Sequence, residues 1–426
     1  MKHYDIAIIG TGPAGLGAAF ELLERRPKAS LLILDKNEYS SGGLRNDCKM
    51  NFSWPIGFPE HCWTEGEAES YLSRVEDFLK PDILEKKNLE RYSRRAEKIG
   101  VSLLAVRQSH LGTDGGLALI KRLVERLKGI GAEVSLGEKA LSIDAEKKVL
   151  VTDKRELEYG DLIVAPGRGG FAFLQDVMAA AGVQYQDNVV DIGLRLETRE
   201  EHYPIVRDYY DPKFLFPKKT RTFCTNSGAA AVVQERYESP LGSPWYSVNG
   251  HAWSSSKPAN GLVNFAILKT VTLTEPLASG QAYAQMLGVQ AALLGGGKPI
   301  MQRVGDFRLG KRSTRAAFSG DLYDFEPSLA SATPGDIGLA APAKTLRALW
   351  NAMKLLDTIV PGLLHPSTIM YYPEIKLYAN RPVFKGSSFA VRPGLYLVGD
   401  GAGTSRGITA AWASGIRAAD GILGRL

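Results

Sequence analysis

The sequence has 426 residues, 44% of them apolar and 23% charged, which is enough apolar material for two or three globular domains. Its net charge of +6 comes from basic residues in short, scattered runs such as 218–221, so a nucleic-acid-binding surface is not favoured. Three widely spaced cysteines (Cys48, Cys62 and Cys224) and the lack of any apolar stretch near the roughly 18 residues of a membrane span predict a cytoplasmic protein without a redox pair, a metal site or stable membrane insertion.

The chain begins with the pattern of a dinucleotide-binding strand–helix–strand unit. Residues 4–9 form an apolar run with β-branched residues, and Gly10–Gly15, of sequence Gly-Thr-Gly-Pro-Ala-Gly, follow at once. A strand that starts so early leaves no room for a signal peptide. Apolar residues recur at i, i+3, i+4 and i+7 over 16–23, which predicts a helix, and residues 31–34 form a second apolar strand that ends in Asp35.

Each glycine of this motif has a physical role in holding a dinucleotide. Gly10 makes the tight turn after the strand, Gly12 lets the backbone approach a pyrophosphate, and Gly15 allows close packing of helix and strand. The helix N-terminus would present N–H groups and a positive dipole end to the phosphates. Asp35 has the spacing of the carboxylate that binds ribose hydroxyls. These features together predict a nucleotide site.

The next part of the chain alternates between polar layers and short apolar runs. Residues 40–49 predict a loop whose paired glycines suit an extended ligand, although an ordinary surface loop fits as well. Residues 64–99 predict one or two charged, solvated helices, and 115–128 predict an amphipathic helix. Strands follow over 134–151, the last two joined as a hairpin, and a buried strand over 161–164 runs into a glycine-containing turn.

From about residue 186 the pattern changes to that of an antiparallel sheet. Alternating apolar and polar runs, separated by Pro, Gly, Asn and Ser, occur at 190–197, 222–224, 246–253 and 262–269. Helices are predicted near 277–294 and 343–357. The second of these has one apolar stripe and one basic face, so it suits a core-facing position, with a membrane surface as the alternative.

The end of the chain repeats the arrangement of strand, glycine turn and helix. Residues 394–398 form an apolar strand, Gly399 and Asp400 follow, and a loop over 401–407 leads into a helix rich in small residues. Such a turn presents backbone N–H donors, and Asp400 offers a carboxylate to hydroxyl groups.

Together these pieces resemble the FAD-binding scheme of two-domain flavoproteins related to the para-hydroxybenzoate hydroxylase fold. The Gly10–Gly15 motif with Asp35 is similar to their ADP site, and 162–169 are similar to their middle strand, with Pro166 in place of Thr. Gly399 and Asp400 resemble the motif that holds the ribityl chain. The resemblance implies that the helix after Asp400 directs its N-terminus at the pyrimidine edge of the flavin, where its dipole stabilises the reduced anion.

Further stretches are similar to a bacterial and archaeal family of FAD-dependent dehydrogenases whose reactions are seldom assigned. The stretches that carry this resemblance are 221–224, 248–250, 305–308, 334–337, 373–376 and 399–407. Many members of that family continue Phe-Cys into Met-Cys-Pro-Gly-Gly, whereas this chain has Thr-Asn-Ser-Gly at 225–228. Chemistry that relies on two cysteines at this place is therefore in doubt.

The resemblance implies an α/β fold, with a Rossmann-like FAD-binding domain and a second domain built on a mixed antiparallel sheet that binds substrate. We expect the FAD-binding domain to comprise residues 1–185 and 381–426, with the substrate domain over 186–380. Its cofactor contacts are expected from Gly10, Gly12, Pro13, Ala14, Gly15, Asp35, Lys36, Gly42, Gly43, Leu44, Arg45, Ala140, Ala165, Pro166, Gly167, Gly399, Asp400, Arg406, Gly407 and Ile408. No second Gly-x-Gly-x-x-Gly follows a strand, so NAD(P)H is expected at most as a transient reductant.

Candidate catalytic residues come from the predicted substrate sheet. His251 and Tyr246 suit acid–base chemistry, and Cys224 suits redox chemistry, but each fits a structural role as well. Arg406 is a candidate for a positive charge beside the reduced flavin, with a surface salt bridge as the alternative.

The function expected from these features is that of an FAD-dependent oxidoreductase. It would transfer hydride to or from an organic small molecule and so saturate or desaturate a C–C or C–N bond. A flavin-dependent monooxygenase is the alternative that the fold permits equally. A flavin-bound RNA-modifying or RNA-binding protein is a further alternative, against which the scattered basic residues argue.

Overall fold

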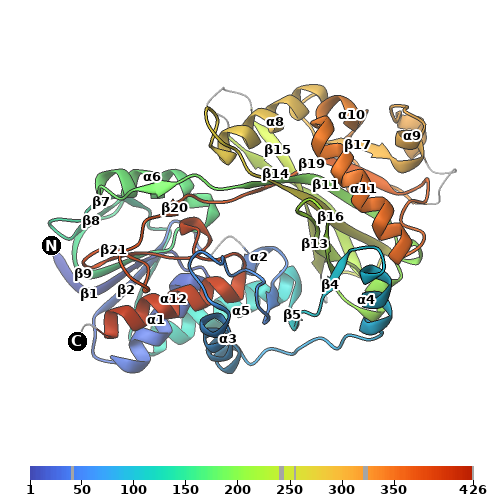
Figure 1. Cartoon of the computed structure of the whole chain (residues 1–426). Helices are drawn as coiled ribbons and strands as arrows, with labels where there is room; N and C mark the ends of the chain where they lie inside the picture. Colours follow the sequence, from blue (N-terminus) through green and yellow to red (C-terminus); the bar gives the residue numbers. More distant parts are fainter. Residues whose placement is uncertain (40–42, 239–243, 254–255, 320–324, 425–426) are drawn as a thin grey trace. The chain divides into compact units, whose positions relative to one another are not determined.

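The computed structural model describes residues 1–39, 43–238, 244–253, 256–319 and 325–424. The chain divides into two compact units (Figure 1). Unit 1 comprises Met1–Ile83, Val106–Asn188 and Tyr378–Leu426, and unit 2 comprises Leu84–Ala105 and Val189–Leu377. These bounds differ from the expected domains mainly because residues 84–105 belong to unit 2. The roles expected for the two domains, FAD binding and substrate binding, stay predictions.

Unit 1 is built on a mainly parallel sheet. Its central strands follow the order β22-β9-β1-β2-β6 and pair in parallel, with β21 antiparallel at one edge and the β7–β8 hairpin attached to β9. The strand bounds are β1 Lys2–Ile9, β2 Leu31–Asp35, β6 Glu133–Leu136, β7 Ala140–Asp144, β8 Val149–Thr152, β9 Glu156–Val164, β21 Ala390–Arg392 and β22 Leu395–Leu397. This strand order confirms the predicted α/β, Rossmann-like fold.

Helices and two small sheets complete unit 1. The helices are α1 Pro13–Arg25, α2 Gly43–Asn46, α3 Glu65–Leu79, α5 Gly112–Gly129, α6 Phe171–Ala180 and α12 Ile408–Leu423, with 3-10 turns η1 Arg168–Gly170 and η4 Asp400–Ala402. The small sheets are β3 Lys49–Asn51 with β5 Gln108–His110, and β10 Tyr185–Gln186 with β20 Arg381–Pro382. The short helix α2 lies in the segment 40–49 that the sequence predicted as a loop.

Helices α1 and α12 lie side by side, although they come from opposite ends of the chain (Figure 1). Small residues permit this approach. A Cβ added at Gly415 would lie 1.9 Å from the carbonyl oxygen of Ala14, and one at Gly17 would lie 2.6 Å from that of Trp412. The packing therefore brings the N-terminal parts of the chain and its C-terminal helix into one core.

Unit 2 is built on a sheet with the strand order β18-β17-β19-β11-β16-β13-β12-β4. All neighbours pair antiparallel except β17 and β18, and a separate hairpin joins β14 and β15. The strand bounds are β4 Ser102–Leu104, β11 Val190–Arg199, β12 Lys213–Phe216, β13 Thr220–Asn226, β14 Ala229–Tyr237, β15 Trp245–Trp253, β16 Leu262–Val271, β17 Ile300–Arg303, β18 Thr333–Pro334 and β19 Ile369–Leu377. The mixed, largely antiparallel sheet expected for the second domain is thus present.

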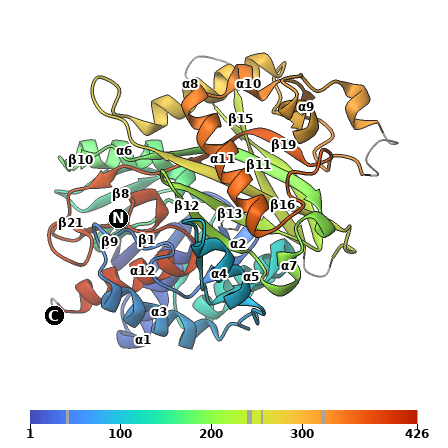
Figure 2. The ribbon, with the colours of Figure 1, turned by 45° about the vertical axis from the view of Figure 1, so that its right-hand side comes forward.

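Helices cover one face of this sheet. They are α4 Leu89–Glu97, α7 Ile205–Asp208, α8 Gly280–Leu294, α9 Val304–Arg308, α10 Ile337–Ala340 and α11 Ala343–Ile359, with 3-10 turns η2 Glu200–His202 and η3 Arg315–Phe318. Helix α11 crosses β11 and β16 (Figure 2) and buries Leu349, Met353 and Leu356 in the apolar core. Its apolar stripe therefore faces the core, as predicted. Among the described residues, none of the helices combines the length and apolarity needed to cross a membrane.

Candidate functional site

Three glycine turns of unit 1, far apart in the sequence, meet at one edge of its parallel sheet. They follow the carboxyl ends of β1, β9 and β22. A Cβ at Gly10 would lie 2.2 Å from the carbonyl oxygen of Ala165, and one at Gly401 would lie 2.5 Å from that of Gly167. A Cβ at Gly399 would lie 3.1 Å from the Cβ of Ala14. The carboxyl edge of a parallel sheet is where open α/β folds bind ligands.

Backbone geometry explains two of the glycines in the first turn. Gly10 has a φ of +104°, a conformation that residues with a Cβ rarely adopt. A Cβ at Gly15 would lie only 1.9 Å from the carbonyl oxygen of Gly10, so helix α1 can leave the strand this closely only with glycine there. The turn therefore holds the start of α1 directly against the end of β1.

Two helices begin at this edge without a side-chain cap. Gly12 precedes α1 and Gly407 precedes α12, and neither N-terminus receives a side-chain hydrogen bond of the capping kind. The first N–H groups of a helix have no partner within the helix, and the dipole makes this end positive. Pro13 occupies the first position of α1 and Ile408 that of α12. Both N-termini suit anionic groups such as phosphates.

A carboxylate stands beside each of these helix starts. Asp35, at the end of β2, accepts hydrogen bonds from the Thr11 N–H and Oγ1, both at 2.9 Å, and from the Asn37 N–H at 2.9 Å. Asp400 accepts from the Gly407 N–H at 3.1 Å and from Ser405 Oγ at 3.0 Å. Both carboxylates are thus oriented by the turns that they join.

Arg406 lies at the start of α12 in a half-buried position. Its N–H donates to the carbonyl of Gly57 at 2.7 Å, and its guanidinium carbon lies 3.7 Å from the ring centroid of Tyr378. The Nη2 atom is buried and has no hydrogen-bond partner among the described residues. A buried donor of this kind suits an anionic ligand, because leaving it unpaired is costly. The structure thus places Arg406 on Tyr378 and not in a salt bridge among the described residues.

The remaining residues expected to contact a cofactor are spread more widely in unit 1. Gly42 lies outside the described residues, and Gly43 begins α2. Leu44 is buried in the apolar core, Arg45 is half-buried and Lys36 is exposed. Ala140, at the start of β7, is buried in the second apolar core of unit 1. Pro166 lies in the turn between Ala165 and Gly167, beside η1.

A set of ionisable side chains that the sequence did not single out lies on the β3–β5 sheet. Asp47 contacts Lys49 Nζ at 2.8 Å and His110 Nε2 at 2.9 Å, and all three side chains are nearly buried. Burial opposes ionisation of Asp47, but Lys49 and the hydrogen bond from His110 outweigh it and hold the pKa of this carboxyl well below its usual range. Thr409 Oγ1 donates to the carbonyl of Asn51 at 2.5 Å, which fixes this sheet beside the start of α12.

The structure separates the candidate catalytic residues of unit 2. The Cys224 carbonyl accepts a hydrogen bond from Arg195 Nη1 at 3.2 Å. Gly250 of β15 also packs on Arg195, since an added Cβ would lie 2.3 Å from Nη1. Alternation along β15 puts Tyr246 on the face of Gly250 and His251 on the opposite face, where its ring centroid lies 6.0 Å from that of Trp253. The Cys224 backbone thus contacts Arg195, whereas the His251 side chain lies on the opposite face of β15.

Around Arg195 the structure shows a buried polar cluster that sequence reasoning missed as a unit. Arg195 forms a bidentate pair with Glu374, at 2.6 and 2.7 Å, and Lys376 Nζ lies 3.0 Å from the same carboxylate. Arg195 Nη1 also donates to Asn264 Oδ1 at 2.8 Å, as does Asn226 Nδ2 at 3.1 Å. The signal in the sequence was the pair Glu374 and Lys376 within an otherwise apolar strand.

The other two cysteines are poor nucleophiles. Burial raises the pKa of both Cys48 and Cys62 to about 12, so neither thiol ionises readily near neutral pH. All three cysteines are free.

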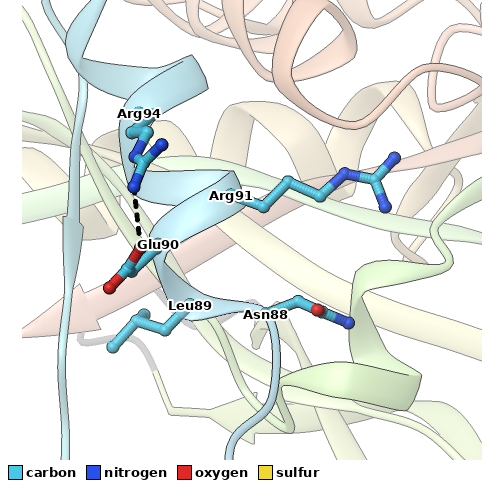
Figure 3. Close-up of a pocket in the computed structure, with 5 residues that line it drawn as sticks. All are labelled: Asn88, Leu89, Glu90, Arg91 and Arg94. Atoms are coloured by element: carbon cyan, nitrogen blue, oxygen red, sulfur yellow. Dashed lines mark hydrogen bonds and ion pairs between the residues drawn. The ribbon is translucent and has the colours of Figure 1, made fainter.

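A hollow at the start of α4 in unit 2 is lined by Asn88, Leu89, Glu90, Arg91 and Arg94 (Figure 3). Figure 3 shows the ion pair between Glu90 and Arg94, with an N–O distance of 2.8 Å, and both side chains are exposed. The hollow contains none of the glycine turns or candidate catalytic residues, so we do not count it as part of the functional site.

Comparison with known proteins indicates the class of protein. Residues 4–199 match the family model described as pyridine nucleotide-disulphide oxidoreductase. The match covers less than half of the chain, and it confirms the prediction of an oxidoreductase.

Individual relatives are more distant. An uncharacterized protein of Clostridium beijerinckii is 23% identical and aligns with 98% of this chain and 80% of its own length. The FAD-containing monooxygenase EthA of Mycobacterium tuberculosis is 31% identical over 87 residues, which are 18% of this chain and only 17% of EthA. A solved structure of L-proline dehydrogenase from P. horikoshii has a TM-score of 0.42 at 11% identity, covering 100% of this chain and 94% of that one. A TM-score this low does not define the fold, which rests on the strand order described above.

Proposed function

We propose that the protein is an FAD-dependent oxidoreductase that transfers hydride to or from an organic small molecule. The observation that carries this proposal is the meeting of three glycine turns with two uncapped helix N-termini at one sheet edge. A single nucleotide-binding turn would need only the Gly10–Gly15 motif and Asp35. The second helix start, with Asp400 and Arg406, suits the other half of a long cofactor with two chemically different ends.

The described residues fit the parts of FAD. The N-terminus of α1 would hold the pyrophosphate, and Asp35 would accept from ribose hydroxyls, since each carboxylate oxygen can accept more than one bond. Asp400 would accept from a ribityl hydroxyl. The N-terminus of α12 and the unpaired Nη2 of Arg406 would stabilise negative charge on the ring.

The cofactor supplies the hydride chemistry when bound, and the residues of this chain bind it and orient the substrate. Bound FAD would supply the hydride acceptor for forming a double bond, or the hydride donor for saturating one, and the protein would supply the group that takes up or returns the proton. We further propose that any reduced nicotinamide binds only transiently, because no second Gly-x-Gly-x-x-Gly motif follows a strand in the sequence.

The experiment is to purify the protein and identify its bound cofactor. We expect yellow protein with flavin absorption bands, about one flavin per chain, and release of FAD on denaturation. Release of FMN would contradict the assignment of the Gly10–Gly15 turn to an adenosine half. Colourless protein that takes up no FAD on reconstitution would overturn the proposal as a whole.

A further inference from the structure

The central sheet of unit 2 has two unlike faces. Along β11, Ile192, Leu194 and Leu196 pack into the apolar core with the helices, while Arg195 and Glu197 lie on the other face. An antiparallel sheet with one face in the core usually turns its polar face to water. Here the side chains of Arg195 and Glu197 are 0% exposed. A buried polar face is costly unless its groups are paired with hydrogen-bond or charge partners.

Lys376 is the cation of this face with the fewest described contacts. It is 3% exposed, and its ammonium lies 3.0 Å from Glu374 Oε1 and 5.7 Å from the ring centroid of Phe223. Glu374 is already engaged by the bidentate pair with Arg195. A lysine ammonium carries three N–H donors. Among the described residues, Glu374 supplies its only oxygen acceptor, and that carboxylate is shared with a second cation.

Asn264 offers a second donor on the same face. Its Oδ1 accepts from both Arg195 and Asn226, which fixes the orientation of the amide. Its Nδ2 is buried and has no hydrogen-bond partner in the described part of the chain. Leaving a buried donor unpaired destabilises the folded protein. The face therefore carries an ammonium that favours a negatively charged acceptor and, among the described residues, an amide donor without an acceptor.

The backbone beside Arg195 has an unusual conformation at Cys224. Cys224 has a φ of +49° at a bulge in β13, and its carbonyl accepts from Arg195. Residues with a Cβ rarely adopt this conformation, and such strain concentrates at functional sites. Glycine at position 250 lets β15 approach these side chains, because a Cβ there would lie within 2.3 Å of atoms of Arg195, Asn226 and Asn264.

Three stretches that the nucleotide site leaves unexplained meet in this cluster. They are 221–224, 248–250 and 373–376, which carry part of the resemblance to FAD-dependent dehydrogenases. Cys224, Gly250, Glu374 and Lys376 all contact the cluster or belong to it. That these three stretches meet is an observation separate from the donors of Lys376 and Asn264, and it indicates the same face of the sheet.

We propose that this face of unit 2 binds the substrate and that the substrate is an organic acid. Lys376 would be the counter-ion of its carboxylate, and Asn264 Nδ2 would donate to a further oxygen of the substrate. Arg195 and Glu374 are positioning residues, since they hold Lys376 and Asn264 in place through each other. This inference rests on the proposed function and adds to it the chemical class of the substrate.

The test uses the purified full-length protein and isothermal titration calorimetry. The probes are benzoate, cinnamate and hexanoate, each compared with its uncharged carboxamide. We expect at least one acid to bind at least tenfold more tightly than its amide. Acids and amides that bind alike, or no binding by any of the three acids, would overturn the inference. This comparison needs no variant and so does not depend on whether a mutant folds.

Variants then locate the charge. Lys376→Met should weaken acid binding at least tenfold, and Lys376→Arg should retain most of it because it keeps the charge. Lys269→Met, on β16 of the same sheet, is the matched control and should bind as the wild type does. Wild-type acid binding by a folded Lys376→Met variant would overturn the assignment.

The flavin content of the same samples separates this inference from the proposed function. Yellow protein that does not distinguish acids from amides contradicts the acid site alone. Colourless protein that takes up no FAD on reconstitution but binds acids through Lys376 contradicts the proposed function and leaves the acid site standing.

Discussion

The Thr11 side chain and backbone both donate to one oxygen of Asp35, each at 2.9 Å. Thr11 is fully buried, and it stands between the first two glycines of the turn. The carboxylate expected to bind a ribose is therefore also the group that ties the glycine turn to β2. Loss of Asp35 would remove a cofactor contact and release the turn at the same time.

We therefore expect Asp35→Ala to weaken FAD binding at least tenfold, as a hydrogen bond to a charged group contributes about 1.5–3 kcal/mol. Thr11→Val removes one donor and keeps the backbone N–H, so it should weaken binding by a smaller factor, about two- to fivefold. Thr11→Ser keeps the hydroxyl and is the control. The measurement is the dissociation constant for FAD by fluorescence titration of apoprotein. An unchanged dissociation constant for folded Asp35→Ala would mean that the adenosine site lies elsewhere.

The contact between α1 and α12 gives a second prediction. Because a Cβ at Gly415 would lie 1.9 Å from the Ala14 carbonyl oxygen, Gly415→Ala should push α12 away from α1. We expect a loss of about 1–3 kcal/mol in the free energy of unfolding, the usual cost of overpacking. Gly66→Ala in α3 is the control, because an added Cβ there meets nothing within 4 Å. Alanine should raise stability at Gly66 by up to about 1 kcal/mol. Equal effects of the two variants in denaturant unfolding would contradict this packing.

The Asp47 cluster gives a prediction that depends on pH. Lys49 and His110 hold the pKa of Asp47 below its unfolded value near 3.8, so its ionisation stabilises the folded state above that pH. The stabilisation should be lost as the pH falls below about 4, because the unfolded state then binds the proton first. Asp47→Asn removes the carboxylate that pairs with the nearly buried Lys49, and we expect a loss of about 3–5 kcal/mol at neutral pH.

Denaturant unfolding of the wild type and Asp47→Asn between pH 7 and pH 3 measures this effect. The difference in stability should shrink as the pH is lowered. The control is Asp82→Asn, since Asp82 is exposed. A difference that grows on acidification would mean that the pKa of Asp47 is raised, not lowered.

Much of unit 1 could be predicted from the sequence because its elements are periodic and its turns have defined chemistry. The strands over 4–9 and 31–34, the hairpin over 140–151 and the amphipathic helix over 115–128 all appear near their predicted bounds. Residues 84–105 were harder to assign to a domain, since their place in unit 2 depends on β4, a strand of three residues that pairs with β12. So short a strand carries no periodic signal, and its pairing partner is remote in sequence.

The candidate site also has one part that could be predicted from the sequence and one part that could not. The meeting of the turns at Gly10, Gly167 and Gly401 follows from the topology of parallel strands, so sequence motifs were sufficient. The cluster around Arg195 was not predicted. Alternation along β11 shows which residues face away from the apolar core, but it does not show whether that face is exposed to water. His251 was a candidate because of its side-chain chemistry and its place beside Gly250 in the predicted sheet, but strand alternation puts its side chain on the face opposite to that of Gly250.

Arg406 provides the last prediction, which concerns the ring half of the cofactor. Its guanidinium lies 3.7 Å from the ring centroid of Tyr378, and its Nη2 is buried without a hydrogen-bond partner among the described residues. If Nη2 stabilises the anionic reduced flavin, Arg406→Met should keep FAD but lower the reduction potential. A charge-assisted contact of about 1.5–3 kcal/mol corresponds to roughly 30–65 mV for a two-electron couple. Dye-linked titration measures the potential, and Arg406→Lys should restore part of it. The alternative is that the guanidinium only packs on Tyr378. In that case Arg406→Met would lower the thermal stability and leave the potential unchanged within error, and Arg406 would not lie beside the ring.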